Sequence, residues 1–235
     1  MKAWEHPLIK KGMPLQLAKR RARIDAGDKP LGWKVGLGAP AAMQKLGLTA
    51  PLVGFLMQSA QIKSGGAVSL KGYVRPVAEP EIAVRMAATP APNASADAVR
   101  GAIKEIMPAI EIVDMQSVPT PDNLDVILES DIFQRHVVIS ETARAGSGID
   151  GLTSRVTRRG ALINTTTDPE ALTGKVVDIV AHVAATLAAY GERLSPGDII
   201  ITGSITPPQM LEADDTAFIH ALDPVGEVRV TFTHD

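Results

Sequence analysis

Two stretches decide the fold: Glu79-Pro80-Glu81-Ile82-Ala83-Val84-Arg85-Met86 and Pro108-Ala109-Ile110-Glu111-Ile112-Val113-Asp114. Both are rich in β-branched and other apolar residues over strand-like lengths, so we predict β-strands over residues 79–86 and 109–113. In an extended segment, side chains two residues apart point to the same face, which places Glu79 beside Glu81. Two neighbouring carboxylates on an apolar strand repel each other and are costly to remove from water. A divalent cation would resolve this conflict; the alternative is an exposed strand edge with solvated charges.

Glu111 supports the cation interpretation because it lies between Ile110 and Ile112, in a run that looks buried. A glutamate in such surroundings is seldom fully buried unless it is paired or bound to metal. Three carboxylates on two strands, with waters or a substrate at the remaining positions, suit octahedral Mg²⁺ or Mn²⁺. Oxygen ligands favour these hard ions over zinc. From the residues alone, a metal site and a solvated strand edge both stay open.

The rest of the chain predicts an α+β protein with many short strands. We expect one catalytic domain over residues 1–235, with an N-terminal helical segment over about 1–30 and a β-rich, metal-binding core over 31–235. Apolar spacing and Gly or Pro boundaries predict the individual elements. The expected helices cover residues 13–26, 41–46, 96–105 and 174–190, and further strands cover 32–37, 68–70, 198–202 and 227–232.

Composition excludes several classes of function. The formal net charge is −2 and the basic residues are scattered, which argues against a nucleic-acid surface. No apolar run approaches the roughly 18 residues that span a bilayer, so we expect no membrane segment. The chain has no cysteine, which removes disulfides, thiolate metal sites and cysteine nucleophiles. The N-terminus lacks the apolar core of a signal peptide, so we expect a cytoplasmic protein.

Three further motifs accompany the two glutamate stretches in a fixed order. They are Gly32-Trp33-Lys34-Val35-Gly36-Leu37, Pro51-Leu52-Val53-Gly54-Phe55-Leu56 and Gly197-Asp198-Ile199-Ile200-Ile201-Thr202-Gly203-Ser204. Each motif is weak by itself, but the five in sequence are fairly specific. Over about residues 13–232 the chain resembles the 2-keto-4-pentenoate hydratase and 4-oxalocrotonate decarboxylase group of the fumarylacetoacetate hydrolase superfamily.

The resemblance implies a fold, a cofactor and a site. The expected fold is a β-rich mixed sheet or roll of the fumarylacetoacetate hydrolase type with flanking helices, in a homo-oligomer. Glu79, Glu81 and Glu111 would hold Mg²⁺ or Mn²⁺, which chelates a small 2-oxo acid and stabilises its enolate. Lys34 matches the family's active-site lysine, and we expect the nearby metal and partial burial to lower its pKa, which suits proton transfer or holding the substrate carboxylate. Ser204 matches a substrate-contacting turn. For these two residues a surface lysine and a plain turn are the alternatives.

The chain also departs from the group that it resembles. Leu52, predicted to contact substrate, stands where hydratases often carry an aspartate, so one acid/base group is missing. Residues 129–134 replace the usual Asp-Asn-x-Ser-Ser loop. These changes affect the parts that select substrate and place water, and they leave the three glutamates in place.

We therefore expect a carbon–oxygen lyase of aromatic catabolism, similar to 2-keto-4-pentenoate hydratase. The alternatives are a 4-oxalocrotonate-type decarboxylase, an acylpyruvate hydrolase and a non-catalytic metal-binding homologue. The hydrolases usually carry a Glu–His lid pair, which has no convincing counterpart here. Because the lyase and decarboxylase of such pathways can associate, a partner enzyme is a further expectation.

Overall fold

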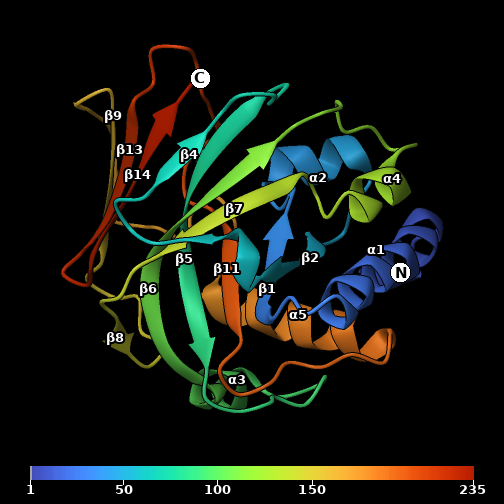
Figure 1. Ribbon diagram of the computed structural model, residues 1–235. Helices are drawn as coiled ribbons and strands as arrows, with labels where there is room; N and C mark the ends of the chain where they lie inside the picture. The colour runs from blue at the N-terminus through green and yellow to red at the C-terminus, as the bar shows by residue number, and fades with distance from the viewer. Residues whose placement is uncertain (1) are drawn as a thin grey trace.

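The computed structural model describes residues 2–235. Within this range the strands form two sheets, and the α-helices lie on the outside (Figure 1). The first sheet has the order β2-β1-β11-β5-β6-β7-β3, with β12 beside β5 and β8 beside β6. Its strands are β1 (Pro30–Gly36), β2 (Leu52–Met57), β3 (Gln61–Ile62), β5 (Pro76–Met86), β6 (Ile103–Asp114), β7 (Gln134–Ile139), β8 (Arg144–Ala145), β11 (Ile199–Ser204) and β12 (Gln209–Met210).

The second sheet has the order β10-β9-β13-β14-β4. Its strands are β4 (Ala67–Ser69), β9 (Thr153–Arg158), β10 (Ala161–Thr166), β13 (Ala217–Asp223) and β14 (Gly226–Thr233). The helices are α1 (Pro7–Asp25), α2 (Pro40–Leu46), α3 (Ala96–Ala102), α4 (Leu124–Glu129) and α5 (Val176–Ala189), with the short 3₁₀ turns η1 (Ala3–Glu5) and η2 (Gln58–Ala60). The predicted α+β class is confirmed.

The first sheet curls into a roll. Strand β2 runs through η2 into β3, and β3 pairs with β7 at the opposite end of the strand order. The chain itself therefore bridges the first and last strands of the path. The interior of the roll holds a small cluster of buried apolar residues, made of Leu56, Ala83, Met107, Ala109, Val137, Ile139, Ile199 and Ile201.

Strands β5 and β6 are buried on both faces, which explains their nearly continuous apolar sequence. Alternate residues of β5, such as Ile82 and Val84, join a large core with the helices, while Ala83 faces the roll interior. In Figure 1, α1, α2, α4 and α5 lie on one side of the roll and β9, β13 and β14 on the other. The long strands therefore carry residues of both cores.

Two predicted helix boundaries are wrong. Helix α1 begins at Pro7 rather than residue 13, because Pro7 occupies a first-turn position and His6 accepts the backbone N–H of Leu8. Its buried residues are Ile9, Gly12, Met13, Gln16 and Leu17, so the buried face also begins before the predicted start of the helix. Helix α3 ends at Ala102 rather than residue 105, because the chain enters β6 there and pairs with β5.

The second sheet packs against β6 through its own apolar core, which includes Ile110, Val156, Phe218 and Val230. His220 of β13 adds a polar anchor within this core. Its Nδ1 lies 3.0 Å from the carbonyl oxygen of Ala109 and its Nε2 lies 3.0 Å from Ser154 Oγ. Burial lowers the pKa of His220 to about 4, so the ring is neutral at pH 7.

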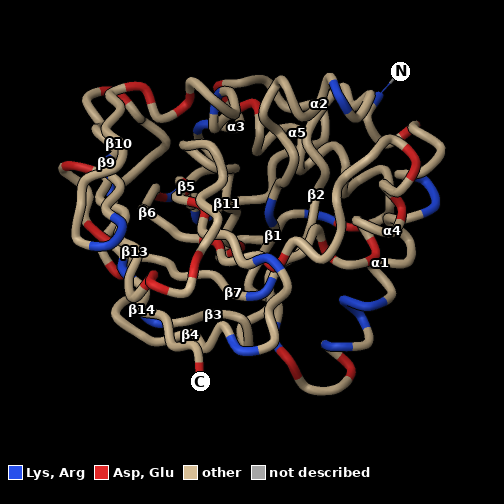
Figure 2. The backbone as a smooth tube through the Cα atoms, turned by 90° about the horizontal axis from the view of Figure 1, so that it is seen from above, with Lys and Arg blue, Asp and Glu red and all other residues tan. Residues whose placement is uncertain are grey.

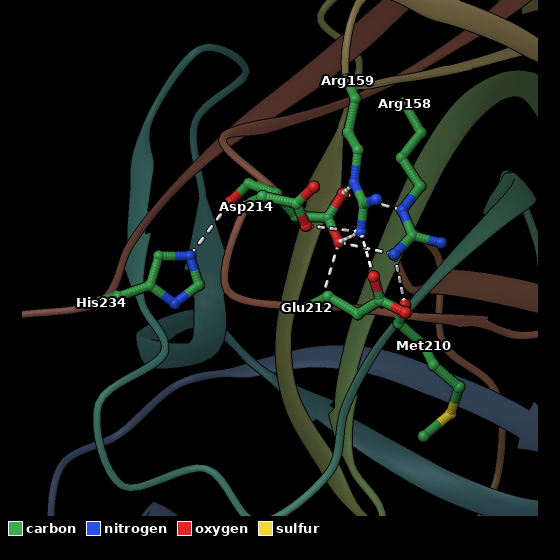
Figure 3. A network of polar contacts seen from close by, with 7 residues as sticks. Arg158, Arg159, Met210, Glu212, Asp214 and His234 are labelled. Atoms are coloured by element: carbon green, nitrogen blue, oxygen red, sulfur yellow. Dashed lines mark hydrogen bonds and ion pairs between the residues drawn. The ribbon is translucent and has the colours of Figure 1, made fainter.

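A network of ion pairs fixes the segment that follows β12 (Figure 3). Arg158 and Arg159, at the end of β9, both donate to the buried carboxylate of Asp215, and Arg159 also pairs with Glu212 and Asp214. Arg158 donates to the carbonyl of Met210 at 2.6 Å as well. The two guanidinium groups hold the pKa of Asp215 well below its usual range, so this anchor persists at mildly acidic pH.

Charged residues of both signs are interspersed around the molecule in Figure 2. Among residues 2–235 no helix is long and apolar enough to cross a membrane.

Candidate metal centre and active site

Glu79, Glu81 and Glu111 come together because β5 and β6 are antiparallel neighbours in a specific register. Glu79 lies directly opposite Glu111, and Glu81 lies opposite Ala109, one pair further along the same face. Directly opposite side chains on such a pair are only about 5 Å apart at Cβ. One carboxylate oxygen from each glutamate lies within 4.8 Å of the others. The three carboxylates predicted from the strand pattern thus form one cluster.

A bulge in β11 supplies a fixed partner for Glu81. The register between β11 and β5 shifts between Ile201 and Ser204, and Gly203 has a φ of 99°. This conformation is open to glycine and turns the Gly203 N–H toward Glu81 Oε2, at 2.6 Å. Glu81 Oε1 is buried and has no hydrogen-bond partner among the described residues. One oxygen of Glu81 is therefore oriented by the backbone and the other lacks a partner.

Lys34 reaches the same cluster from β1. Its side chain is 1% exposed, and its Nζ forms an ion pair with Glu111 Oε1. Nζ also lies 3.4 Å from the carbonyl oxygen of Ile132. The alternative of a surface lysine is thereby excluded, and the predicted site residue lies within the glutamate cluster.

The cluster carries unbalanced negative charge. Burial and the neighbouring Glu111 carboxylate raise the pKa of Glu79 to about 7. Burial, Glu111 and Glu79 raise the pKa of Glu81 well above its usual range, and burial also raises that of Glu111. For Lys34, burial disfavours the ammonium, but attraction to Glu111 and Asp131 outweighs it and raises the pKa. Without a cation the carboxylates around Lys34 thus keep its pKa above the ordinary value, and the lowering expected beside a bound metal stays a prediction.

These residues fit a hard divalent cation. Three carboxylates and one ammonium leave an excess of two negative charges, which a doubly charged ion would neutralise. The unpartnered oxygen of Glu81 and the mutual repulsion of the three glutamates both indicate a missing positive charge. The donors are all carboxylate oxygens, as Mg²⁺ and Mn²⁺ prefer.

A cavity of about 140 Å³ lies against this cluster, and Glu79 and Ser204 are among its lining residues. Ser204 Oγ donates to the carbonyl oxygen of Thr206 at 2.7 Å, which orders the turn beside the cavity. Leu52, by contrast, is buried in the large core with the helices and does not line this cavity. The structure therefore brings Ser204 to the cluster but gives Leu52 a packing role.

A larger cavity, of about 490 Å³, lies at the other end of the roll, next to Arg85 and Glu105 of β5 and β6. These two residues pair with each other at 2.7 Å and are far along the strands from the glutamate cluster. The smaller cavity is the candidate active site, because unbalanced buried charge points to a site for chemistry more directly than cavity size does.

Sequence reasoning missed Asp131. It lies after α4 in the segment that departs from the family pattern, is buried, and accepts the Phe55 N–H through Oδ1 at 2.9 Å. Burial raises the pKa of Asp131 to about 8, while Lys34 is the strongest influence that lowers it. The departure of residues 129–134 from the family pattern was the available signal.

Added Mg²⁺ should stabilise the protein more strongly as the pH rises. Glu79 has a raised folded-state pKa, so without a cation the folded state loses stability as the pH climbs from about 4.5 through about 7. A bound cation removes that repulsion. With Mg²⁺ at one fixed concentration, about 100 times its Kd at pH 8, we expect a Tm increase of about 5 °C or more near pH 8 and a smaller one near pH 5.5.

Thermal unfolding with and without Mg²⁺, at matched ionic strength, checks this prediction. A gain that is the same at all pH values would contradict it, because cation binding would then be independent of carboxylate ionisation.

Comparison with known proteins identifies the family. The model named fumarylacetoacetate (FAA) hydrolase C-terminal matches residues 34–233. The chain is 28% identical to a 4-oxalocrotonate decarboxylase of Pseudomonas putida over 82% of this chain and 74% of that protein. It is 26% identical to a 2-hydroxyhexa-2,4-dienoate hydratase of Comamonas testosteroni over 93% and 84%, respectively.

A solved structure has the same fold. The 4-oxalocrotonate decarboxylase of Pseudomonas putida G7, complexed with magnesium and adipate, superposes with a TM-score of 0.83 at 24% identity. The match covers 93% of this chain and 83% of that one. The predicted β-rich roll with flanking helices is thereby confirmed. With a family model that spans most of its length, the chain belongs to the fumarylacetoacetate hydrolase family.

Proposed function

We propose that this protein is a divalent-metal-dependent lyase that hydrates a small 2-oxo acid in its dienol form, as 2-keto-4-pentenoate hydratases do. The observation that carries the proposal is the cluster of Glu79, Glu81 and Glu111, which has Lys34 in ion-pair contact and a cavity alongside. Named hydratases and decarboxylases among the relatives support an enzyme of this class. We propose that the whole chain acts as one catalytic domain.

The three glutamates would hold Mg²⁺ or Mn²⁺, the ion for which their oxygens and charge are suited. When bound, the cation supplies the positive charge that stabilises the negative charge developing on the 2-oxo oxygen. Lys34 would hold the substrate carboxylate or move a proton at the carbon chain, since its ammonium is fixed beside Glu111. Ser204, in the ordered turn, would contact the substrate from the cavity wall.

The apolar interior of the roll would keep bulk water from reaching the cluster from behind. Ala83, Ala109 and Ile201 lie next to the glutamates on the same face and belong to the buried interior layer. An apolar surface that excludes water strengthens the electrostatic effect of Lys34 on groups in the cavity, because fewer water dipoles screen its charge.

Hydration is tested by incubating the protein with Mg²⁺ and 2-hydroxypenta-2,4-dienoate. We expect the dienol absorbance to fall as water adds, with a 4-hydroxy-2-oxo acid as the product identified by NMR. Chelation with EDTA should stop the reaction, and added Mg²⁺ should restore it. A protein that binds Mg²⁺ but leaves the dienol unchanged would refute the hydratase assignment.

Decarboxylation is the second candidate, favoured by the 28% identical decarboxylase relative. Release of CO₂ from 4-oxalocrotonate, with no hydration of the dienol, would assign this reaction instead. Cleavage of acylpyruvates would assign the C–C hydrolase alternative. Mg²⁺ and oxalate binding without turnover of any of these acids would favour a non-catalytic metal-binding protein.

A further inference from the structure

The turn at residues 131–133 has an unusual backbone. Asp131, Ile132 and Phe133 have φ angles of 57°, 52° and 66°, so three consecutive non-glycine residues are left-handed. This region is disfavoured for side chains with a Cβ, and most of all for a β-branched residue such as Ile132. Such a conformation persists only when its surroundings hold it, and it is frequent at functional sites.

Hydrogen bonds and packing hold this turn firmly. The N–H groups of Asp131 and Ile132 each donate at 2.8 Å to carbonyls in α4. Asp131 Oδ1 accepts the Phe55 N–H from β2 at 2.9 Å. The Ile132 side chain packs against Gly36 of β1, where a Cβ would meet Ile132 Cγ2 at 2.7 Å. The turn is thus locked between α4, β1 and β2.

The turn faces Lys34. A Cβ placed on Gly54 would lie 2.8 Å from both Asp131 Oδ1 and Lys34 Cγ, so these two side chains flank the space beside Gly54 that a larger residue would fill. The neighbouring Ile132 carbonyl oxygen lies 3.4 Å from Lys34 Nζ. Asp131 Oδ2 is buried and has no partner among the described residues. The strained turn therefore brings a carboxyl group with a spare oxygen beside the lysine.

We propose that Asp131 is a positioning residue for Lys34, holding its side chain over Gly54 independently of Glu111. The inference deepens the proposed function and rests on it. A bound cation would share the negative charge of Glu111 and so weaken its attraction for the Lys34 ammonium. Asp131 lies outside the glutamate cluster and would keep the ammonium in place when that happens. It would also supply a carboxyl near Lys34 in a chain that has Leu52 at the usual aspartate position.

The test compares Asp131→Asn with Asp97→Asn as a matched control. Asparagine keeps an oxygen for the Phe55 N–H but has no ionisable carboxyl, so the fold should hold and the Tm should change little. Asp97 is an exposed residue of α3 and pairs only with Arg100 in the described chain. We expect Asp131→Asn to lower kcat by about tenfold or more, with KM and Mg²⁺ affinity within about threefold of wild type. The control should match wild type.

Two readouts separate this inference from the choice of reaction. Deuterium exchange at C3 of a 2-oxo acid, followed by NMR, reports proton transfer whether or not hydration follows. The ¹⁵N signal of the Lys34 ammonium in Mg²⁺-free protein, assigned by its loss in Lys34→Met, reports the lysine's anchoring without any turnover. In Asp131→Asn we expect the exchange to slow by about tenfold and the lysine signal to shift or broaden.

Each outcome has a distinct meaning. If wild type exchanges the C3 proton but does not hydrate the dienol, the proposed hydratase reaction is refuted, and the exchange rates of wild type and Asp131→Asn still test the role of Asp131. If wild type shows no exchange, the Lys34 ¹⁵N signal tests that role instead. Deuterium exchange at the wild-type rate in Asp131→Asn, or an unchanged Lys34 ¹⁵N signal in that variant, would overturn the positioning role. If Gly54→Ala, whose methyl group would displace both side chains, reproduces the Asp131→Asn effect, the shared contact is supported.

Discussion

Glu81→Gln should lower magnesium-dependent turnover by about 10³-fold and Mg²⁺ affinity by about 100-fold, while making the metal-free protein more stable. Glutamine keeps an oxygen for the Gly203 N–H, so the bulge of β11 has its partner. The lost carboxylate removes a ligand to the ion, and several kcal/mol of charge stabilisation correspond to about three powers of ten in rate. Without metal, the same change removes a buried charge that Glu111 and Glu79 repel, which should add about 1 kcal/mol or more to the free energy of unfolding.

Loss of activity together with a gain in metal-free stability makes this prediction specific to a metal ligand. A residue with only a packing role would lose stability together with activity. Glu105→Gln on β6 is the matched control: Glu105 lies on the same face as Glu111, but it pairs with Arg85 at the far end of the strands. Steady-state kinetics, Mg²⁺ titration and denaturant unfolding in EDTA measure the three effects. Turnover by Glu81→Gln within about tenfold of wild type would contradict the metal-site assignment.

The glutamate cluster could be predicted because it follows from local rules. Alternation along one strand places Glu79 beside Glu81, and an unpaired glutamate in an apolar run marks a buried charge. The register that sets Glu111 opposite Glu79 depends on tertiary structure, and neither the strand pattern nor the resemblance to the family predicted it. The strand positions themselves were predicted with errors of a few residues at their ends.

The rest of the site could not be predicted, for physical reasons. Asp131 lies beside Lys34 because of a left-handed turn in which isoleucine and phenylalanine follow the aspartate, and neither of these two is a usual turn residue. The direction of the Lys34 pKa shift depends on how many carboxylates surround the ammonium, which a single strand does not reveal. Leu52 follows the family motif, but the structure packs it into the core with the helices.

The short helix α4 and the strands of the second sheet, apart from those at 68–70 and 227–232, also escaped prediction. Strand β10 (Ala161–Thr166) has exposed and half-exposed positions, and apolar and polar residues do not alternate regularly along it. The sequence pattern therefore gives little indication of a strand there. These elements matter for the site indirectly. The second sheet supports β6 through His220, and Arg158 and Arg159 fix the segment after β12.

Lys34→Met should have the opposite stability effect to Glu81→Gln while also abolishing activity. Methionine fills much of the lysine stem's volume but leaves Glu111 without its buried cationic partner, which should cost about 3 kcal/mol in the metal-free protein. Saturating Mg²⁺ should recover most of that loss, because the ion then neutralises the carboxylates. Mg²⁺ affinity should equal or exceed that of wild type, since the ammonium no longer competes for Glu111.

Turnover by Lys34→Met should nonetheless fall by about 10²- to 10⁴-fold even with metal bound, as expected when a proton-transfer or substrate-holding group is removed. Lys34→Arg separates the two roles: arginine keeps the charge and can hold a carboxylate, but its guanidinium does not release a proton near neutral pH. A kcat close to wild type in Lys34→Arg would indicate that the lysine holds substrate. Equal losses in both variants, at unchanged KM and saturating Mg²⁺, would indicate proton transfer. Wild-type turnover by Lys34→Met would exclude Lys34 from the chemistry, and the glutamate cluster would then have to act with a different acid/base group.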